Sequence, residues 1–148
     1  MVKVHTAAFA ELSPRTLYEI LRLRAEVFVI EQECCYQDLD GRDVEDTTRH
    51  VWAEAAGEVT GYLRVLTEPD GGHRVGRVVV RRAARGSGVA QRLLAEALRL
   101  TGDAPSVLSA QSHLEGFYAR FGYRTVGPGF DEDGIPHLPM RRDPTAAR

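Results

Sequence analysis

The strongest constraint on the fold is a valine-rich segment that runs through a basic, glycine-bearing turn into an amphipathic helix. The segment reads Arg77-Val-Val-Val-Arg-Arg-Ala-Ala-Arg-Gly-Ser-Gly-Val-Ala90. Its β-branched residues predict a strand over Val75–Arg82. The apolar spacing that follows predicts a helix over Gly88–Thr101. A strand that leads directly into a helix indicates an α/β chain.

The turn between this strand and helix has the chemistry of an anion site. The first turn of a helix presents unpaired backbone N–H groups at the positive end of the helix dipole. Glycines at positions 86 and 88 let a ligand approach those groups closely, and Arg81, Arg82 and Arg85 add positive charge. These features favour a phosphate or pyrophosphate. A structural turn with a helix cap would carry the same two glycines, so the pair alone leaves both interpretations open.

Two other phosphate-binding motifs are excluded at this turn. A P-loop needs Gly-Lys-Ser/Thr after its spacer, which the segment lacks. A dinucleotide fingerprint needs a third glycine where Gln91 stands. The spacing present is Arg85-x-x-Gly88-x-Ala90.

The remaining sequence predicts more strands than helices in its first half. Ser13 and Pro14 are typical of an N-cap and a first helical residue, and the apolar stripe after them extends to Phe28. A tight turn at Gly57-Glu58 predicts two neighbouring strands. We expect strands at Val2–Phe9, His50–Ala56, Val59–Thr67, Val75–Arg82, Ser106–Ala110, Tyr123–Val126 and His137–Arg141, and a third helix over Ser112–Phe121.

Composition restricts the class of protein. With 148 residues, 43% of them hydrophobic and 27% charged, residues 1–148 fit one soluble domain with a real core. No apolar stretch approaches the roughly 20 residues of a membrane span, and no export signal is recognisable. A net charge of −2 argues against a general nucleic-acid binder. The adjacent Cys34 and Cys35 cannot easily form a bridge and fit a reducing cytoplasm, and the histidines make no metal spacing with them.

Charge is unevenly distributed along the chain. Residues 31–46 hold seven acids against Arg42 alone, whereas residues 71–95 hold six arginines and no acid. We expect the first segment to favour cations and the second anions, the alternative being two loops of opposite sign that attract each other. Arg24 lies on the apolar stripe, where it either extends its charged end into solvent or pairs with an acid such as Glu31 or Asp38.

The turn and the pieces around it are similar to one known family. Arg85-Gly-Ser-Gly-Val-Ala90 resembles the acetyl-CoA pyrophosphate loop of the GNAT superfamily of N-acetyltransferases, and the order of elements matches that fold, a mixed and mostly antiparallel sheet flanked by helices. Ala90 stands where many relatives have glycine, a change that the family accepts. Over most of its length the chain resembles the ElaA-type branch of this superfamily. The matching segments are Arg24-Ala-Glu-Val-Phe-Val-Ile-Glu-Gln32, Cys34, Tyr36-Gln-Asp-Leu-Asp40, Gly76-Arg-Val78, Ala110-Gln111, Phe117-Tyr-Ala-Arg-Phe-Gly-Tyr123, Gly134-Ile-Pro-His137 and Met140.

The resemblance implies a role for each matching residue. The strand of Val78, Val79 and Val80 would pair through its backbone with the pantetheine arm of the cofactor. Tyr118 falls on the tyrosine that often protonates the departing CoA thiolate, the alternative being an aromatic packed on the helix face of Phe117 and Phe121. The pyrophosphate loop would comprise Arg85, Gly86, Ser87, Gly88, Val89 and Ala90, and Gln111 falls near the helix on the other side of the cofactor.

A general base is harder to assign, although one is needed because an amine is mostly protonated at neutral pH. Glu33 is the first candidate, since it follows the end of the first helix in the acidic segment, and Asp40 and His73 are reserves. The alternative for each is an exposed side chain of a loop. The resemblance favours an Arg24 ion pair that orders the substrate loop. The residues expected at the acceptor site are Arg24, Glu31, Asp38 and Asp40.

The expected function is therefore an acetyl-CoA-dependent N-acetyltransferase. The acceptor would be a primary amine of a small molecule or a peptide that attacks the thioester directly in a ternary complex, and a backbone N–H near Val78–Val80 would face the oxyanion. One alternative is a catalytically silent acyl-CoA-binding module, and another is an acyltransferase resembling the acyl-homoserine lactone synthases. We expect no metal, nucleic-acid or membrane partner, and a homodimer is one option for so small a domain.

Overall fold

Most strands of this chain run antiparallel to their neighbours in one sheet. The computed structural model describes residues 1–34 and 36–144. Within them the sheet order is β1-β2-β3-β4-β5-β8-β6, with β7 pairing with β8, and β4 with β5 is the parallel pair. The prediction of an α/β fold with a mostly antiparallel sheet is confirmed. The strands are β1 (Val2–Ala7), β2 (Arg49–Ala55), β3 (Glu58–Thr67), β4 (His73–Val80), β5 (Ser106–Gln111), β6 (Arg124–Thr125), β7 (Phe130–Glu132) and β8 (Ile135–Arg142).

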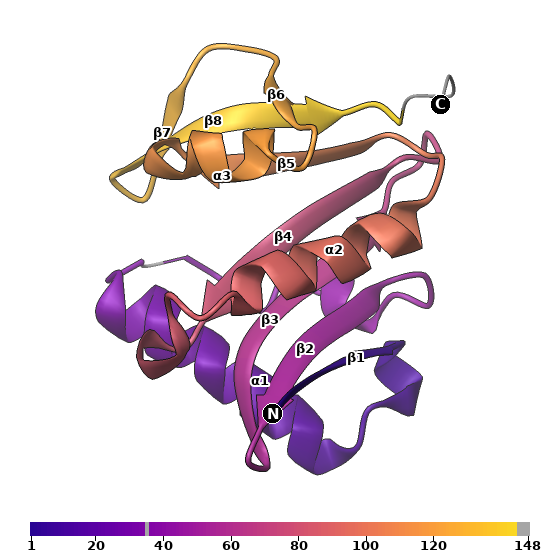
Figure 1. Ribbon diagram of the computed structural model, residues 1–148, viewed down its shortest axis with the longest axis vertical. Helices are drawn as coiled ribbons and strands as arrows, with labels where there is room; N and C mark the ends of the chain where they lie inside the picture. Colours follow the sequence, from indigo (N-terminus) through magenta and orange to yellow (C-terminus); the bar gives the residue numbers. More distant parts are fainter. Residues whose placement is uncertain (35, 145–148) are drawn as a thin grey trace.

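Helices cover both faces of this sheet. Figure 1 shows α2 lying over strands β2 to β4. The consecutive β3 residues Tyr62 and Leu63 point to opposite faces of the sheet. Tyr62 belongs to a hydrophobic cluster with Ile20 and Leu23 of α1, and Leu63 belongs to a second cluster with Leu93 and Leu94 of α2. The helices are α1 (Pro14–Arg24), α2 (Val89–Thr101) and α3 (Glu115–Ala119), with a π-helical segment η2 (Ala25–Glu31) and 3₁₀ turns η1 (Phe9–Glu11), η3 (Arg42–Val44), η4 (Arg82–Ala84) and η5 (Ser112–Leu114).

The helix ends follow the capping residues predicted for them. The Ser13 hydroxyl accepts a hydrogen bond from the backbone N–H of Thr16 at 3.0 Å, and Pro14 begins α1. Gly88 is the N-cap of α2 and Gly102 follows its last residue. In the described residues no helix combines the length and the apolar character needed to cross a bilayer.

Several expected boundaries are wrong in detail. The β2–β3 turn lies at Ala56-Gly57 rather than Gly57-Glu58, because both central residues of this tight hairpin take positive φ, 53° and 80°. Strand β1 ends at Ala7, since Glu11 accepts a hydrogen bond from the backbone N–H of Ala8 at 2.9 Å and folds the chain into η1.

The first helix also changes its winding where a continuous helix was expected. Beyond Arg24 the chain forms η2, which buries Val27 and Phe28 against the sheet. The backbone N–H of Gln32 closes this segment by donating to the carbonyl of Val27 at 2.8 Å. Such wide turns occur frequently at functional sites.

An ion-pair network ties the acidic segment to this helix and to the sheet. Arg24 is fully buried, and its guanidinium donates to Asp38 Oδ2 at 3.0 Å and to Asp43 Oδ1 at 2.9 Å. Its expected pairing with Asp38 is confirmed. The alternative partner, Glu31, instead binds Arg85.

Two arginines of the sheet complete the network. Arg64 of β3 donates to Asp40 Oδ2 at 2.6 Å and to Asp43 Oδ1 at 3.1 Å. Arg77 of β4 donates to Asp38 Oδ1 at 2.8 Å. Three arginines thus face three aspartates. Only Arg77 belongs to the basic segment 71–95, so its contact with Asp38 is the attraction between the two charged segments that the sequence left open as an alternative.

These contacts shift the titration of the aspartates. Burial opposes ionisation of Asp43, but the hydrogen bond and charge of Arg24 and the charge of Arg64 outweigh it and hold the Asp43 pKa below its usual range. The hydrogen bond from Arg64 is the main cause that lowers the Asp40 pKa. Both carboxylates therefore remain ionised at neutral pH and keep their arginines paired.

We predict that Asp43→Asn lowers the free energy of unfolding by about 3 kcal/mol, because it leaves part of the Arg24 charge buried and unpaired. Urea denaturation followed by circular dichroism measures the change. Asp46→Asn, an exposed change in the same segment, is the control and should alter the free energy by less than about 0.5 kcal/mol. Equal losses in the two variants would contradict a stabilising role for the network.

Candidate active site

Strands β4 and β5 separate soon after they meet. They pair only at His73 with Ser106 and at Arg74 with Val107. On the other side of β4 the register against β3 shifts at Arg77, which has a φ of 52°. Such a bulge bends a strand. The backbone of Val78–Val80 thus runs along an edge that β5 does not cover.

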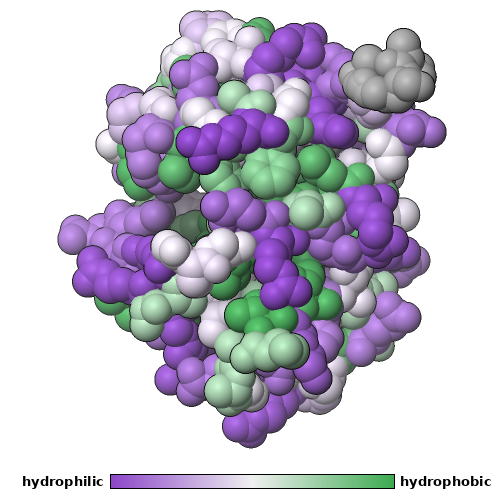
Figure 2. Space-filling model, in the orientation of Figure 1, coloured by the Kyte–Doolittle hydropathy of each residue, from purple (hydrophilic) through white to green (hydrophobic). Residues whose placement is uncertain are grey.

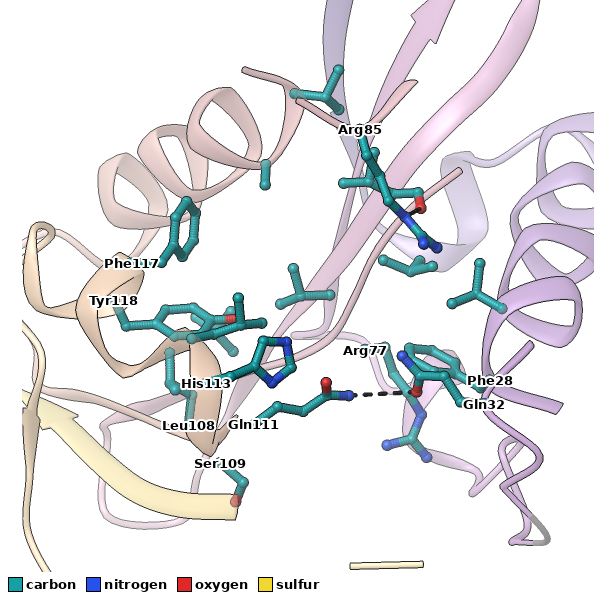
Figure 3. A pocket seen from close by; sticks show the side chains of 18 of the residues that line it. Phe28, Gln32, Arg77, Arg85, Leu108, Ser109, Gln111, His113, Phe117 and Tyr118 are labelled. Carbon is teal, nitrogen blue, oxygen red and sulfur yellow. Dashed lines mark hydrogen bonds between the residues drawn. The ribbon is translucent and has the colours of Figure 1, made fainter. Parts of the chain in front are cut away.

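A cavity of about 560 Å³ occupies this separation. Its walls come from β4, β5, η2, the turn before α2, α3 and the β7–β8 hairpin. Figure 2 shows a hollow in the surface between the upper and lower parts of the molecule, with apolar surface at its floor. Figure 3 shows side chains from β4, β5, η2 and α3 pointing into it.

The glycine-bearing turn lies at one end of the cavity. Gly86 and Gly88 have φ of 81° and 87°, which L side chains rarely adopt, and nothing lies within 4 Å of where a Cβ would stand on either. No side chain caps the first turn of α2. Its N–H groups therefore remain available to an anion. Gly86, Gly88, Val89 and Ala90 line the cavity, whereas the Ser87 hydroxyl donates to the carbonyl of Ala84.

Arg85 joins this turn to the end of η2. Its guanidinium donates to both carboxylate oxygens of Glu31, at 2.7 and 2.9 Å, and its Nε donates to the carbonyl of Val80 at 3.0 Å. The hydrogen bond from Arg85 is the main cause that lowers the pKa of Glu31. Two residues that the sequence assigned to different sites, cofactor and acceptor, thus form one ion pair on the cavity wall.

Tyr118 of α3 is both packed and accessible to the cavity. Its ring makes edge contacts with Phe117 and Tyr123, with centroids 5.1 and 6.1 Å away, and it is only 5% exposed. Figure 3 shows the side chain pointing into the cavity. Burial raises its pKa to about 12, so the phenol remains a protonated donor.

The cavity has two halves, one on each face of the sheet. Tyr118 belongs to the hydrophobic cluster shared with α2, so its half is the one that the turn and α2 border. Gln111 of β5 marks the other half, since its side-chain amide donates to Gln32 Oε1 beside η2 at 3.4 Å (Figure 3). The gap between β4 and β5 connects the halves. A molecule lying along β4 could therefore bring a reactive group from the first half to a second molecule in the other.

Several predicted site residues lie away from the cavity wall. Glu33 is exposed and has a φ of 55°. His73 lies near the parallel end of β4, beside a separate cavity of about 350 Å³. Arg24, Asp38 and Asp40 are held in the ion-pair network and do not appear among the described residues that line the large cavity.

The structure also brings to the cavity residues for which the sequence predicted no role. Among these, Glu132 and His137 come from the β7–β8 hairpin, whose first strand was not predicted at all. His113 of η5 and Gln32 line it as well. The sequence signals for this hairpin were the strand expected at His137–Arg141 and the family-like segment Gly134-Ile-Pro-His137.

The cysteines and histidines form no metal site in the part of the chain that is described. Cys34 is buried, 6% exposed, and Cys35 lies outside the described residues.

Comparison with known proteins agrees with this geometry. Residues 12–144 match the family model described as an acetyltransferase (GNAT) domain. ElaA of Escherichia coli is 40% identical over 149 residues, which cover 97% of each chain. Its crystal structure superposes with a TM-score of 0.91 at 39% identity, covering 97% of this chain and all of that one.

Two further relatives are similarly close. A UPF0039 protein of Mycobacterium tuberculosis is 49% identical over 136 residues, 89% of this chain and 87% of that protein. The crystal structure of an acyl-CoA N-acyltransferase from Pseudomonas aeruginosa is 42% identical, with a TM-score of 0.87 over 96% of this chain and 99% of that one. The family model matches nearly the whole chain, and these relatives are about 40 to 49% identical to it. The chain therefore belongs to the GNAT acetyltransferase family and to its ElaA-like branch.

Proposed function

We propose that this protein transfers an acetyl group from acetyl-CoA to a primary amine of a small molecule or a peptide, as one domain over residues 1–148. The observation that carries the proposal is the continuous cavity from the uncapped turn of α2 through the β4–β5 gap. The diphosphate of CoA would lie at Gly86–Ala90, and the pantetheine arm would pair with the backbone of Val78–Val80. The thioester would then reach the gap beside Tyr118.

The reaction needs few groups beyond this alignment. The amine attacks the thioester carbonyl from the second half of the cavity, and a backbone N–H of Val78–Val80 donates to the developing oxyanion. Tyr118 then gives its phenolic proton to the departing thiolate. Burial keeps the phenol neutral before the transfer but also makes it a weaker acid, so the support for this role is the side chain pointing into the cavity.

The acidic segment 31–46, which we expected to favour cations, suggests a cationic acceptor such as a polyamine, an amino sugar or a lysine, but its contacts in the structure give little support to a polycation. Asp38 and Asp40 already face three arginines within the chain, and Glu31 faces Arg85. These carboxylates are therefore compensated before any acceptor binds. A primary amine with one positive charge fits the cavity better than a polyamine does.

The test of this function is release of free thiol from acetyl-CoA with a panel of primary amines: butylamine, phenethylamine, glucosamine, spermidine and Nα-acetyl-lysine. We expect at least one amine with a single ammonium group to raise thiol release above hydrolysis. CoA binding without turnover of any amine would favour the silent acyl-CoA-binding module. Preference for octanoyl-CoA over acetyl-CoA would favour the alternative that resembles the lactone synthases.

We predict that Gly88→Ala weakens CoA binding about tenfold or more, equivalent to about 1.4 kcal/mol. A side chain at a φ of 87° strains the turn and displaces the N–H groups that would hold the diphosphate. Isothermal titration with CoA measures the affinity. Gly57→Ala is the control, since Gly57 has a similar φ of 80° but lies in the β2–β3 turn. Equal affinities in both variants and wild type would place the diphosphate elsewhere.

We predict that Tyr118→Phe lowers kcat by about 10- to 100-fold while CoA affinity stays the same, because only the proton donor is removed. Steady-state thiol release with the best amine of the panel measures kcat. Tyr18→Phe, a change at an exposed tyrosine on α1, is the control. An unchanged kcat in Tyr118→Phe would leave the ring with a packing role alone.

A further inference from the structure

Two titratable side chains in the acceptor half of the cavity have no role in the reaction described above. They are Glu132 of β7 and His137 of β8, and both line the cavity wall. His137 is buried, whereas the Glu132 side chain is 58% exposed. A histidine can act as a general base, and a carboxylate at the same opening can bind an ammonium group.

Strand register places these side chains on the acceptor face of the sheet. His137 pairs with Gln111 of β5 on one side and with Phe130 of β7 on the other, and paired residues point to the same face. Glu132 lies two residues beyond Phe130 and so shares that face. Gln111 reaches Gln32 beside η2. This row therefore faces the half of the cavity opposite Tyr118.

The surroundings of His137 fix which nitrogen can accept a proton. Its Nδ1 lies 2.7 Å from the carbonyl oxygen of Ile135, and a carbonyl only accepts hydrogen bonds. In the neutral ring Nδ1 must therefore carry the hydrogen, which leaves a lone pair on Nε2. The ring also stacks on Phe130, with centroids 5.8 Å apart, which holds its orientation.

Glu132 provides a negative charge beside that lone pair. Of the carboxylates lining the cavity, Glu31 is engaged at both oxygens by Arg85. Glu132 Oε2 lies 3.9 Å from His137 Nε2, which is too long for a direct hydrogen bond. A nitrogen placed between these two acceptor atoms would be about 2.9 Å from each, the usual hydrogen-bond length.

We propose that Glu132 and His137 form the binding site for the ammonium group of the acceptor, and that His137 Nε2 removes the proton that must leave before the amine attacks. The assignment rests on the proposed function and names its general base. It also sets the substrate class, a primary amine with a single ammonium group, because the site offers one carboxylate.

The protons balance over the whole reaction. R–NH3⁺ donates to Glu132 and His137, and one proton moves to Nε2 to give R–NH2 and an imidazolium. The amine lone pair forms the C–N bond, the C–S bond breaks, and the thiolate takes the Tyr118 proton. The nitrogen loses a second proton, which restores the tyrosine, and the imidazolium releases its proton to solvent. The products are the amide, CoA–SH and one H⁺.

Two variants separate recognition of the ammonium from its deprotonation. Glu132→Gln removes the charge at an exposed position and should raise the amine KM about tenfold with little change in kcat. His137→Asn keeps a donor for the Ile135 carbonyl but removes the basic nitrogen, and should lower kcat about 100-fold. Both should bind CoA with wild-type affinity. Asp133→Asn removes a charge from the same hairpin and should leave KM and kcat unchanged.

Chemical rescue distinguishes a base from a packing residue. Added imidazole should restore part of the thiol release of His137→Ala, which it would not do if the ring only supported the hairpin. Unchanged KM in Glu132→Gln, or unchanged kcat in His137→Asn, overturns the proposal. So does a large loss of kcat in Glu33→Gln with none in His137→Asn, which would make Glu33 the base. If wild-type protein acetylates no amine of the panel, the proposed function fails instead.

Discussion

The separation of β4 from β5 determines the rest of the site. Two residue pairs hold the strands together, and after them the backbone of β4 has an open edge. Backbone N–H and C=O groups need partners, so the groups of this edge that have no partner in the protein must bind water or a ligand. The pantetheine arm of CoA carries amide groups that can complete it as an added strand would. The turn before α2 lies at the end of this edge, where the phosphates would follow.

The buried charge network supports the acceptor side of this opening. Breaking up a buried ion pair is costly, so Arg24, Arg64 and Arg77 hold residues 38–43 firmly against α1 and the sheet. Arg77 stands at the bulge of β4, which couples the network to the strand that lines the cavity. Residues 38–43 thus do not line the cavity but hold Arg77, which does, and in the proposed acceptor site the carboxylate comes from the β7–β8 hairpin.

How far the sequence could predict this structure depended on whether the signals were local. The N-cap at Ser13, the strand of valines and the glycine turn each rest on a few neighbouring residues. The cap and the turn were found at their expected places, and the strand, expected at Val75–Arg82, was found two residues earlier at His73–Val80. Strand β7 has three exposed residues and no alternating apolar pattern, so it could not be recognised. The partner of Arg24 depended on how the 38–43 loop folds back. Pairing with Asp38 was predicted, but the additional contact with Asp43 was not. His137 lies in a segment that resembles the family, but its tautomer and its distance to Glu132 are properties of the folded hairpin alone.

We infer that the open edge of β4 and the turn before α2 bind acyl-CoA together. Amide hydrogen exchange with and without CoA tests both parts in one experiment. We expect CoA to slow exchange of the backbone N–H groups at Val78–Val80 and at Gly86–Ala90, and to leave β1 and the β2–β3 turn unchanged. Tight CoA binding without protection at either segment, or with protection confined to another face of the sheet, would show that CoA binds elsewhere on the protein.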